Sequence, residues 1–170
     1  LVFYGGFITV ILGMSLYLYW RKLSVLQVLD IYAPLVPLGH AIGRLGCLAA
    51  GCCYGRPTEL PWGIVFPEGS LAPAGIPLHP TQLYEALTNL LLGIGLLSLH
   101  AHRRYTGQTF ATLLVGYAFF RFINEFFRGD AARGFAIAGL SNAQLTALLL
   151  ASIGGLIMGW KRLRHTEPQG

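Results

Sequence analysis

Four polar residues share one face of a predicted helix that continues from an apolar run over 110–120. Arg121, Asn124, Glu125 and Arg128 are spaced three or four residues apart, which places their side chains together. A charged group near a membrane midplane costs about 2.5 to 3.5 kcal/mol, so it normally faces protein or a wet cavity. We expect Arg121 and Glu125 to be catalytic and Arg128 to bind substrate. The alternative is an ion pair that only steadies the bundle, with Arg128 reaching the interface.

A further arginine, Arg44, lies among glycines at the end of another apolar stretch. Its guanidinium offers a fork of donors that suits phosphate oxygens, and glycine lets a backbone and a ligand approach closely. We therefore expect a substrate-binding segment that comprises Gly43, Arg44, Gly46 and Gly55. His40 lies one turn before Arg44, where a packed core histidine is the better interpretation.

The third polar cluster, HPTQLYE, opens another apolar stretch at 79–85. His79 and Glu85 are candidate acid–base groups, and Gln82 and Tyr84 are candidate substrate-binding groups. The structural alternative is a helix start, because Thr81 with Glu85 four residues later resembles a loose capping arrangement. That alternative does not explain why Gln82 and Glu85 both enter the membrane layer.

The elements that must position these clusters are helices. The chain is 54% hydrophobic and 11% charged, more apolar than a soluble domain of 170 residues can bury. Open strands in lipid would leave backbone groups unpaired, and a helix needs about 20 residues to cross. The sequence predicts an all-α fold, a polytopic transmembrane helix bundle forming a single membrane domain over 1–170, with about five spans at 2–20, 31–50, 83–99, 110–127 and 140–160.

Basic residues predict the orientation of these spans. They follow the first, third and fifth spans, as Arg21 and Lys22, Arg103 and Arg104, and Lys161, Arg162 and Arg164. The positive-inside rule puts those ends in the cytoplasm. The proline-rich segment 51–80 is then a small irregular extracytoplasmic loop region, with one short strand at 62–66, and all three polar clusters meet at that face. Because the basic residues flank apolar runs, the net charge of +5 does not indicate nucleic-acid binding.

Four strings of this sequence resemble, in order, those of the bacterial prolipoprotein diacylglyceryl transferases. They are GRLG at 43–46 with the later glycines, HPTQLYE at 79–85, RFINEFFRGD at 121–130 and LSNAQL at 140–145. The resemblance runs from the family's third membrane helix to its last. It implies a multi-pass protein of the bacterial cytoplasmic (inner) membrane whose active site faces the periplasmic side. The implied reaction moves a diacylglyceryl group from phosphatidylglycerol to the lipobox cysteine thiol of an exported prolipoprotein. Its expected partners are these two substrates and membrane lipids, without a cofactor, a metal or nucleic acid.

The resemblance also implies roles for individual residues. Arg44 matches the family's phospholipid-binding arginine and Arg121 its second essential arginine, where cationic donors stabilise the departing phosphate. Tyr4, in FYGG, stands where the family has a histidine, and it is included among the substrate-binding candidates. Cys47 and Cys52 stand where the family has Asn and Glu.

These substitutions support an alternative function. A noncatalytic relative would bind anionic phospholipid or a precursor's signal segment. A transport or structural membrane protein is favoured only if the polar faces are isolated ion pairs.

The cysteines Cys47, Cys52 and Cys53 are the only ones in the chain. A structural disulfide and inert buried thiols are the leading interpretations. A metal site that includes His79 is weaker, because the spacing is not that of common zinc motifs. A thiol that holds the transferred group transiently is the remaining hypothesis.

Overall fold

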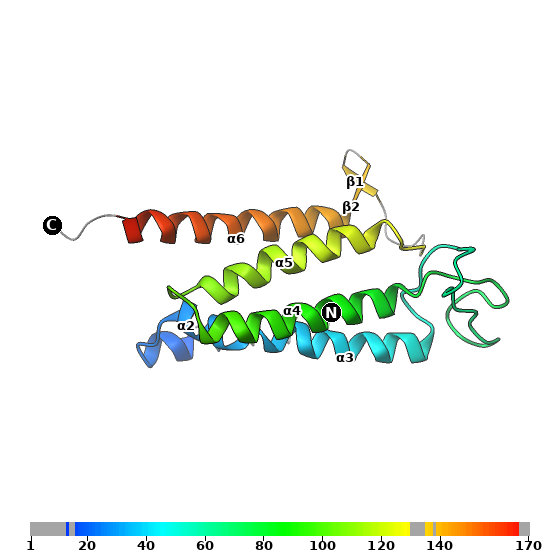
Figure 1. The fold of residues 1–170 in the computed structure, drawn as a ribbon, viewed down its shortest axis with the longest axis horizontal. Helices are drawn as coiled ribbons and strands as arrows, with labels where there is room; N and C mark the ends of the chain where they lie inside the picture. Colours follow the sequence, from blue (N-terminus) through cyan, green and yellow to red (C-terminus); the bar gives the residue numbers. More distant parts are fainter. Residues whose placement is uncertain (1–12, 14–15, 130–134, 138, 167–170) are drawn as a thin grey trace.

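The protein is a bundle of helices that lie along one long axis (Figure 1). The computed structural model describes residues 13, 16–129, 135–137 and 139–166. Its helices are α2 (Val25–Tyr32), α3 (Leu35–Ala50), α4 (Thr81–Ala101), α5 (Gln108–Glu125) and α6 (Asn142–Thr166). Helix α4 packs between α3 and α5, and α6 packs on α5. The predicted all-α fold is confirmed.

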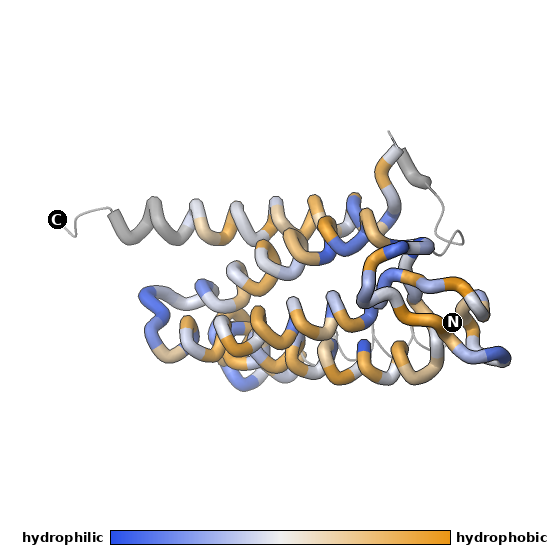
Figure 2. The backbone as a smooth tube through the Cα atoms, turned by 45° about the vertical axis from the view of Figure 1, so that its right-hand side comes forward, coloured by the Kyte–Doolittle hydropathy of each residue, from blue (hydrophilic) through white to orange (hydrophobic). Residues whose placement is uncertain are grey.

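In the part of the chain that the structure describes, three stretches of helix are long and apolar enough to cross a membrane: Val25–Ala50, Thr81–Ala101 and Asn142–Trp160. They match the second, third and fifth predicted spans. Figure 2 shows apolar residues along the helices, and many large apolar side chains are exposed, among them Ile42, Leu87, Leu91, Leu149 and Leu156. Such surface belongs in lipid rather than in water.

The other two predicted spans have different outcomes. Helix α5 corresponds to the fourth, but with its polar end it is not apolar enough to stand among the membrane-crossing helices of the described chain. Its crossing therefore stays a prediction. Most of the first span, 2–20, lies outside the described residues, although 16–20 are helical.

The second predicted span is two helices rather than one. Helix α2 ends at Tyr32 and α3 begins at Leu35, with Ala33 and Pro34 between them. Pro34 has no N–H to donate to the carbonyl of Asp30, so the helical hydrogen-bond pattern is interrupted there, although Ala33 and Pro34 both keep right-handed helical dihedral angles. The helical segment also starts six residues before the predicted Ile31.

Asp30 links α2 to the start of α5. Its buried carboxylate accepts hydrogen bonds from the backbone N–H of Gly107 at 2.6 Å and of Phe110 at 2.9 Å. The first N–H groups of a helix lack partners within that helix, and the negative charge of a carboxylate there also interacts favourably with the helix dipole. This cap was not predicted from the sequence, because Asp30 lies 77 residues from Gly107 and 80 residues from Phe110 along the chain.

The segment 51–80 is irregular, as predicted, and lies at the end of the bundle where α3 ends and α4 begins (Figure 1). The strand expected at 62–66 does not form. Only isolated bridges pair Ile64 with Leu78 and Phe66 with Ala74. The prolines of this segment interrupt backbone pairing, and a small core of Phe66, Ala72 and Leu78 holds it together.

A short hairpin precedes α6 and was not predicted. Strand β1 (Phe135–Ile137) pairs antiparallel with β2 (Leu140–Ser141). Because Leu140 and Ser141 belong to β2, helix α6 begins at Asn142 rather than at the predicted residue 140.

Candidate functional site

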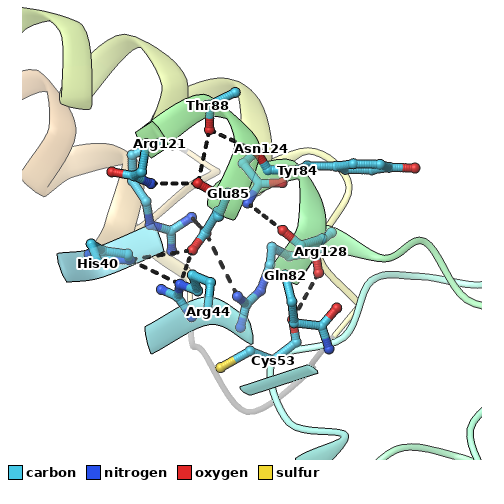
Figure 3. Close-up of polar contacts among 12 residues, drawn as sticks. His40, Arg44, Cys53, Gln82, Tyr84, Glu85, Thr88, Arg121, Asn124 and Arg128 are labelled. Carbon is cyan, nitrogen blue, oxygen red and sulfur yellow. Dashed lines mark hydrogen bonds and ion pairs between the residues drawn. The ribbon is translucent and has the colours of Figure 1, made fainter. Parts of the chain in front are cut away.

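The buried carboxylate of Glu85, on α4, lies at the centre of a cluster of charged residues (Figure 3). Arg44 of α3 contacts Oε2 of Glu85 through its Nε atom. Nη1 of Arg121, on α5, lies 3.4 Å from Oε1, and Nη1 of Arg128, just past α5, lies 3.9 Å from the same oxygen. Three guanidinium groups from different parts of the chain therefore converge on one carboxylate.

The polar face predicted on the fourth span does point into the protein. Nη1 of Arg121 lies 2.7 Å from Oε2 of Glu125, the pair expected from their separation by four residues. The side chains of Arg121, Glu125 and Arg128 are at most 11% exposed. The structure thus brings together Arg44, Glu85, Arg121, Glu125 and Arg128, which we call the arginine cluster. Their roles in binding or catalysis stay predictions.

His40 belongs beside this cluster and is not an isolated core histidine. The Nε atom of Arg44 donates to Nε2 of His40 at 3.0 Å, and that nitrogen lies 3.8 Å from Oε2 of Glu85. The signal in the sequence was the four-residue spacing of His40 and Arg44, which places both on one face of α3.

The arginine cluster has one net positive charge, because three guanidinium groups face two carboxylates. Charges interact more strongly here than at a wet surface, because the local dielectric constant is lower. An anion that binds in the cluster would neutralise this excess positive charge. Planar guanidinium groups from separate helices are suited to the oxygens of a phosphate group.

His79, a predicted catalytic residue, lies just before α4 and contacts Tyr84 rather than Glu85. Its Nδ1 atom is 3.2 Å from the hydroxyl of Tyr84, which accepts a hydrogen bond of 2.8 Å from Nε1 of Trp62. In Figure 3 the ring of Tyr84 points away from Glu85. Among the described residues, no hydrogen bond or ion pair joins His79 to Glu85.

These aromatic groups line a cavity of about 400 Å³ with an almost wholly apolar wall. We call it the aromatic pocket; its lining is Leu60, Trp62, His79, Tyr84, Thr88, Phe120, Ile123, Asn124 and Phe127. Burial lowers the pKa of His79, and the charge of Arg56 lowers it further. The imidazole is therefore neutral at neutral pH and has a nitrogen that can accept a proton.

Polar residues of the first turn of α4 connect it to the segment after α3. The hydroxyl of Thr81 donates to the carbonyl of Cys53, and Nε2 of Gln82 donates to the carbonyl of Cys52, both at 2.8 Å. Thr81 makes no capping hydrogen bond to its own helix, so the alternative of a capping arrangement with Glu85 is wrong. The side-chain amide nitrogen of Gln82, a predicted substrate-binding residue, therefore holds the backbone of Cys52 in place.

The predicted substrate-binding glycines have different surroundings. A Cβ atom at Gly55 would lie 2.5 Å from Cβ of His79 and 2.7 Å from the carbonyl oxygen of Phe127, so a side chain does not fit. Gly43 and Gly46 have nothing within 4 Å at the equivalent point. Gly55 thus serves close backbone packing, whereas the other two face open space. Tyr4 lies outside the described residues.

The three cysteines are free thiols. Their sulfur atoms lie within 4.8 Å of one another. Burial raises the pKa of Cys52 to about 11, helped by a hydrogen bond with Cys47. Burial also acts to raise the pKa of Cys53, but the hydrogen bond and charge of Arg128, with the charge of Arg44, outweigh it and lower that pKa. The disulfide considered from the sequence is not formed here.

The amino-acid sequence matches a family of known proteins. The sequence profile of the family described as prolipoprotein diacylglyceryl transferase matches residues 1–160. A phosphatidylglycerol–prolipoprotein diacylglyceryl transferase of Clostridium tetani is 38% identical over 163 residues, covering 96% of this chain and 65% of the relative. A second such transferase, from Clostridium perfringens, is 39% identical over 169 residues, covering 99% and 65%.

The corresponding protein of Bordetella avium is 42% identical over 170 residues, covering 98% of this chain and 62% of the relative. The chain therefore spans a little under two thirds of the length of these relatives. The profile match and the level of identity over nearly the whole chain show that it belongs to the prolipoprotein diacylglyceryl transferase family.

Proposed function

We propose that this protein transfers a diacylglyceryl group from phosphatidylglycerol to the lipobox cysteine of an exported prolipoprotein. The cysteine sulfur attacks the glyceryl carbon that carries the phosphate. A carbon–sulfur bond forms, the carbon–oxygen bond breaks, and glycerol phosphate leaves with the bonding electrons. The thiol proton passes to a base. The names of the relatives supply the two substrates, and the arginine cluster supports the chemistry.

The convergence of Arg44, Arg121 and Arg128 on Glu85 is the observation that carries this proposal. Negative charge develops on the leaving phosphate as the carbon–oxygen bond breaks. Cationic donors already fixed at that place stabilise the transition state more than the ground state. The net positive charge of the cluster also favours an anionic headgroup over a zwitterionic one.

The aromatic pocket offers an apolar chamber on the neighbouring face of α4. Its wall suits an acyl chain or the apolar part of a signal segment, and it lies against α4 and α5, the helices that carry Glu85 and Arg121. His79 opens onto this chamber in its neutral form. It is therefore our candidate for the base that takes the thiol proton, since a thiol with a pKa of about 8.5 needs deprotonation to attack.

We place the protein in the bacterial cytoplasmic membrane, with the arginine cluster and the aromatic pocket at the periplasmic side. The basic residues at the ends of the predicted spans support this orientation. In a variant with all three cysteines replaced by serine, Glu68→Cys, at an exposed position at the same end as the sites, should react in intact cells with a membrane-impermeant thiol reagent. In the same background, His102→Cys should react only after permeabilisation. Reaction of His102→Cys in intact cells would reverse the orientation.

A transfer assay tests the function. Membranes that contain the full-length protein, incubated with phosphatidylglycerol and a lipobox peptide, should yield a thioether-linked diacylglyceryl peptide. Arg44→Ala and Arg121→Ala should each remove most of this activity, and Arg56→Ala, an exposed arginine at the same end, should keep it at a pH well above 6.5, the ordinary pKa of His79. Absence of product above the level of membranes without the protein would reject catalysis.

A second function, lipid binding without turnover, is favoured by one observation. Glu85 already contacts all three guanidinium groups, so a headgroup must share them with it or displace it. Under this alternative, phosphatidylglycerol copurifies with the protein and Arg44→Ala reduces that binding, while the transfer assay gives no product with any variant.

A further inference from the structure

The three thiols form a compact cluster where α3 ends. Cys47 lies in the last turn of α3, and Gly51 ends the helix with a left-handed φ of 67°. This turn brings the chain back, so that the backbone N–H of Cys52 donates to the carbonyl of Cys47 at 3.1 Å. All three sulfur atoms then lie within 4.8 Å of one another, close enough to bind one metal ion together.

The backbone that carries these thiols is held in an unusual conformation. Cys53 has a φ of 63°, a left-handed value that residues other than glycine rarely adopt. The hydrogen bonds from Thr81 and Gln82 fix the carbonyls of Cys53 and Cys52 against the first turn of α4. The positions of the sulfur atoms are therefore set by two helices and not by a free loop.

We propose that Cys47, Cys52 and Cys53 bind one soft metal ion, Cu(I) or Zn(II), through three sulfur ligands. A metal–sulfur bond of about 2.3 Å requires sulfur atoms roughly 4 Å apart around the ion, and no two of the sulfur atoms here are more than 4.8 Å apart. Soft thiolate ligands select these ions over the harder Mg²⁺ and Ca²⁺.

The charge around the thiols suits such a complex. Three thiolates around a divalent ion leave one net negative charge, and around a monovalent ion they leave two. Arg128 hydrogen-bonds the side chain of Cys53, and Arg44 lies near enough to act on it electrostatically. Those guanidinium groups offset the negative charge of the complex. A bound ion would tie the last turn of α3 to the segment that follows it, whose carbonyls accept hydrogen bonds from the first turn of α4.

Metal titration of the full-length protein tests this site. The protein is reduced, kept anaerobic in detergent, and titrated with Cd²⁺ as a spectroscopic probe, then with Zn²⁺ and with Cu⁺ held by a competing chelator. We expect one ion per chain, a sulfur-to-metal charge-transfer band with Cd²⁺, and protection of all three thiols from alkylation. Replacing any one cysteine by serine should weaken binding at least tenfold.

The controls separate this site from others and from catalysis. A variant that combines His100→Gln with His102→Gln, at the far end of α4, should bind metal as the unchanged protein does. Alkylation of the unchanged protein with and without metal gives an answer even if the triple serine variant does not fold. Neither readout depends on transfer activity, so failure here leaves the proposed function standing.

Three results would overturn the proposal. One is that the thiols react with the alkylating reagent equally well without metal and with saturating Zn²⁺ or Cu⁺. Another is full metal binding by a folded triple serine variant. The third is a stable disulfide in protein purified without reductant, combined with no metal uptake after its reduction, which would make the cluster a redox pair instead.

Discussion

Arg44 and Arg121 contact different oxygens of the same carboxylate, although they lie on helices that α4 separates. Glu85 therefore joins α3 to α5 through α4. A phosphate group that binds both guanidinium groups would occupy a comparable position between the two helices. The carboxylate thus keeps the two arginines close to each other in the absence of substrate.

Removal of this carboxylate charge should destabilise the protein strongly. Glu85→Gln keeps the shape of the side chain but leaves three buried guanidinium groups opposite Glu125 alone. Loss of one partner of a buried ion pair costs about 3 to 5 kcal/mol, so the free energy of unfolding should fall by an amount of this order. Thermal unfolding in detergent measures it. Glu68→Gln, at an exposed site, is the control, and equal stability of the two variants would contradict the central role of Glu85.

Anionic lipid binding should depend on Arg44 far more than on Arg56. Hydrogen bonds to charged groups contribute about 1.5 to 3 kcal/mol, so Arg44→Ala should weaken binding of phosphatidylglycerol roughly tenfold to a hundredfold. Arg44→Lys should recover part of the loss, because lysine keeps the charge without the planar fork. Lipid bound per protein, measured at neutral pH in mixed micelles, checks this. Similar losses in Arg44→Ala and Arg56→Ala would indicate only nonspecific attraction.

The fold was predictable where local patterns determine it. Apolar runs indicated α4 and α6, and the spacing of Arg121 and Glu125 indicated the inward face of α5. The break between α2 and α3 had a local signal in Pro34. By contrast, the cap that Asp30 provides for α5 depends on contacts between distant segments, which helical periodicity does not encode.

The sequence was enough to predict which residues belong to the candidate site, but not how they are arranged in space. Three motifs named Arg44, Glu85 and Arg121, since buried charge in apolar helices is costly without a function or a partner. The motifs did not show that His79 contacts Tyr84 on one face of α4 while Glu85 meets the arginines on the neighbouring face. That separation follows from the path of segment 51–80, whose backbone bridges are set by tertiary contacts.

The protonation of His79 should depend on Arg56. Burial lowers the pKa of His79 below its ordinary value of 6.5, and the charge of Arg56 lowers it further. Arg56→Gln removes the second effect, so the pKa should rise toward 6.5. Titration of the imidazole by NMR, assigned through its loss in His79→Gln, measures the shift. If His79 is the base, the acidic limb of the activity profile moves to higher pH by the same amount.

The lowered pKa of His79 should also make the stability of the folded protein fall at acidic pH. A histidine with a lowered pKa binds fewer protons in the folded state than in the unfolded state. Its contribution to stability is complete above pH 6.5 and falls as the pH decreases through the lowered pKa. The unchanged protein should therefore lose more stability on acidification than His79→Gln does. An identical pH dependence of the two melting temperatures would exclude a lowered pKa.

A matched pair of glycine substitutions should distinguish packing from substrate binding. Gly55→Ala places a methyl group 2.6 Å from the carbonyl oxygen of His79, and backbone must move to admit it. Overpacking of this kind costs about 1 to 3 kcal/mol, so thermal stability should fall. Gly43→Ala meets nothing within 4 Å and should leave stability unchanged or slightly higher, since alanine favours a helix. A fall in lipid binding by a stable Gly43→Ala protein would place Gly43 at the substrate, whereas unchanged binding would remove it from the predicted site.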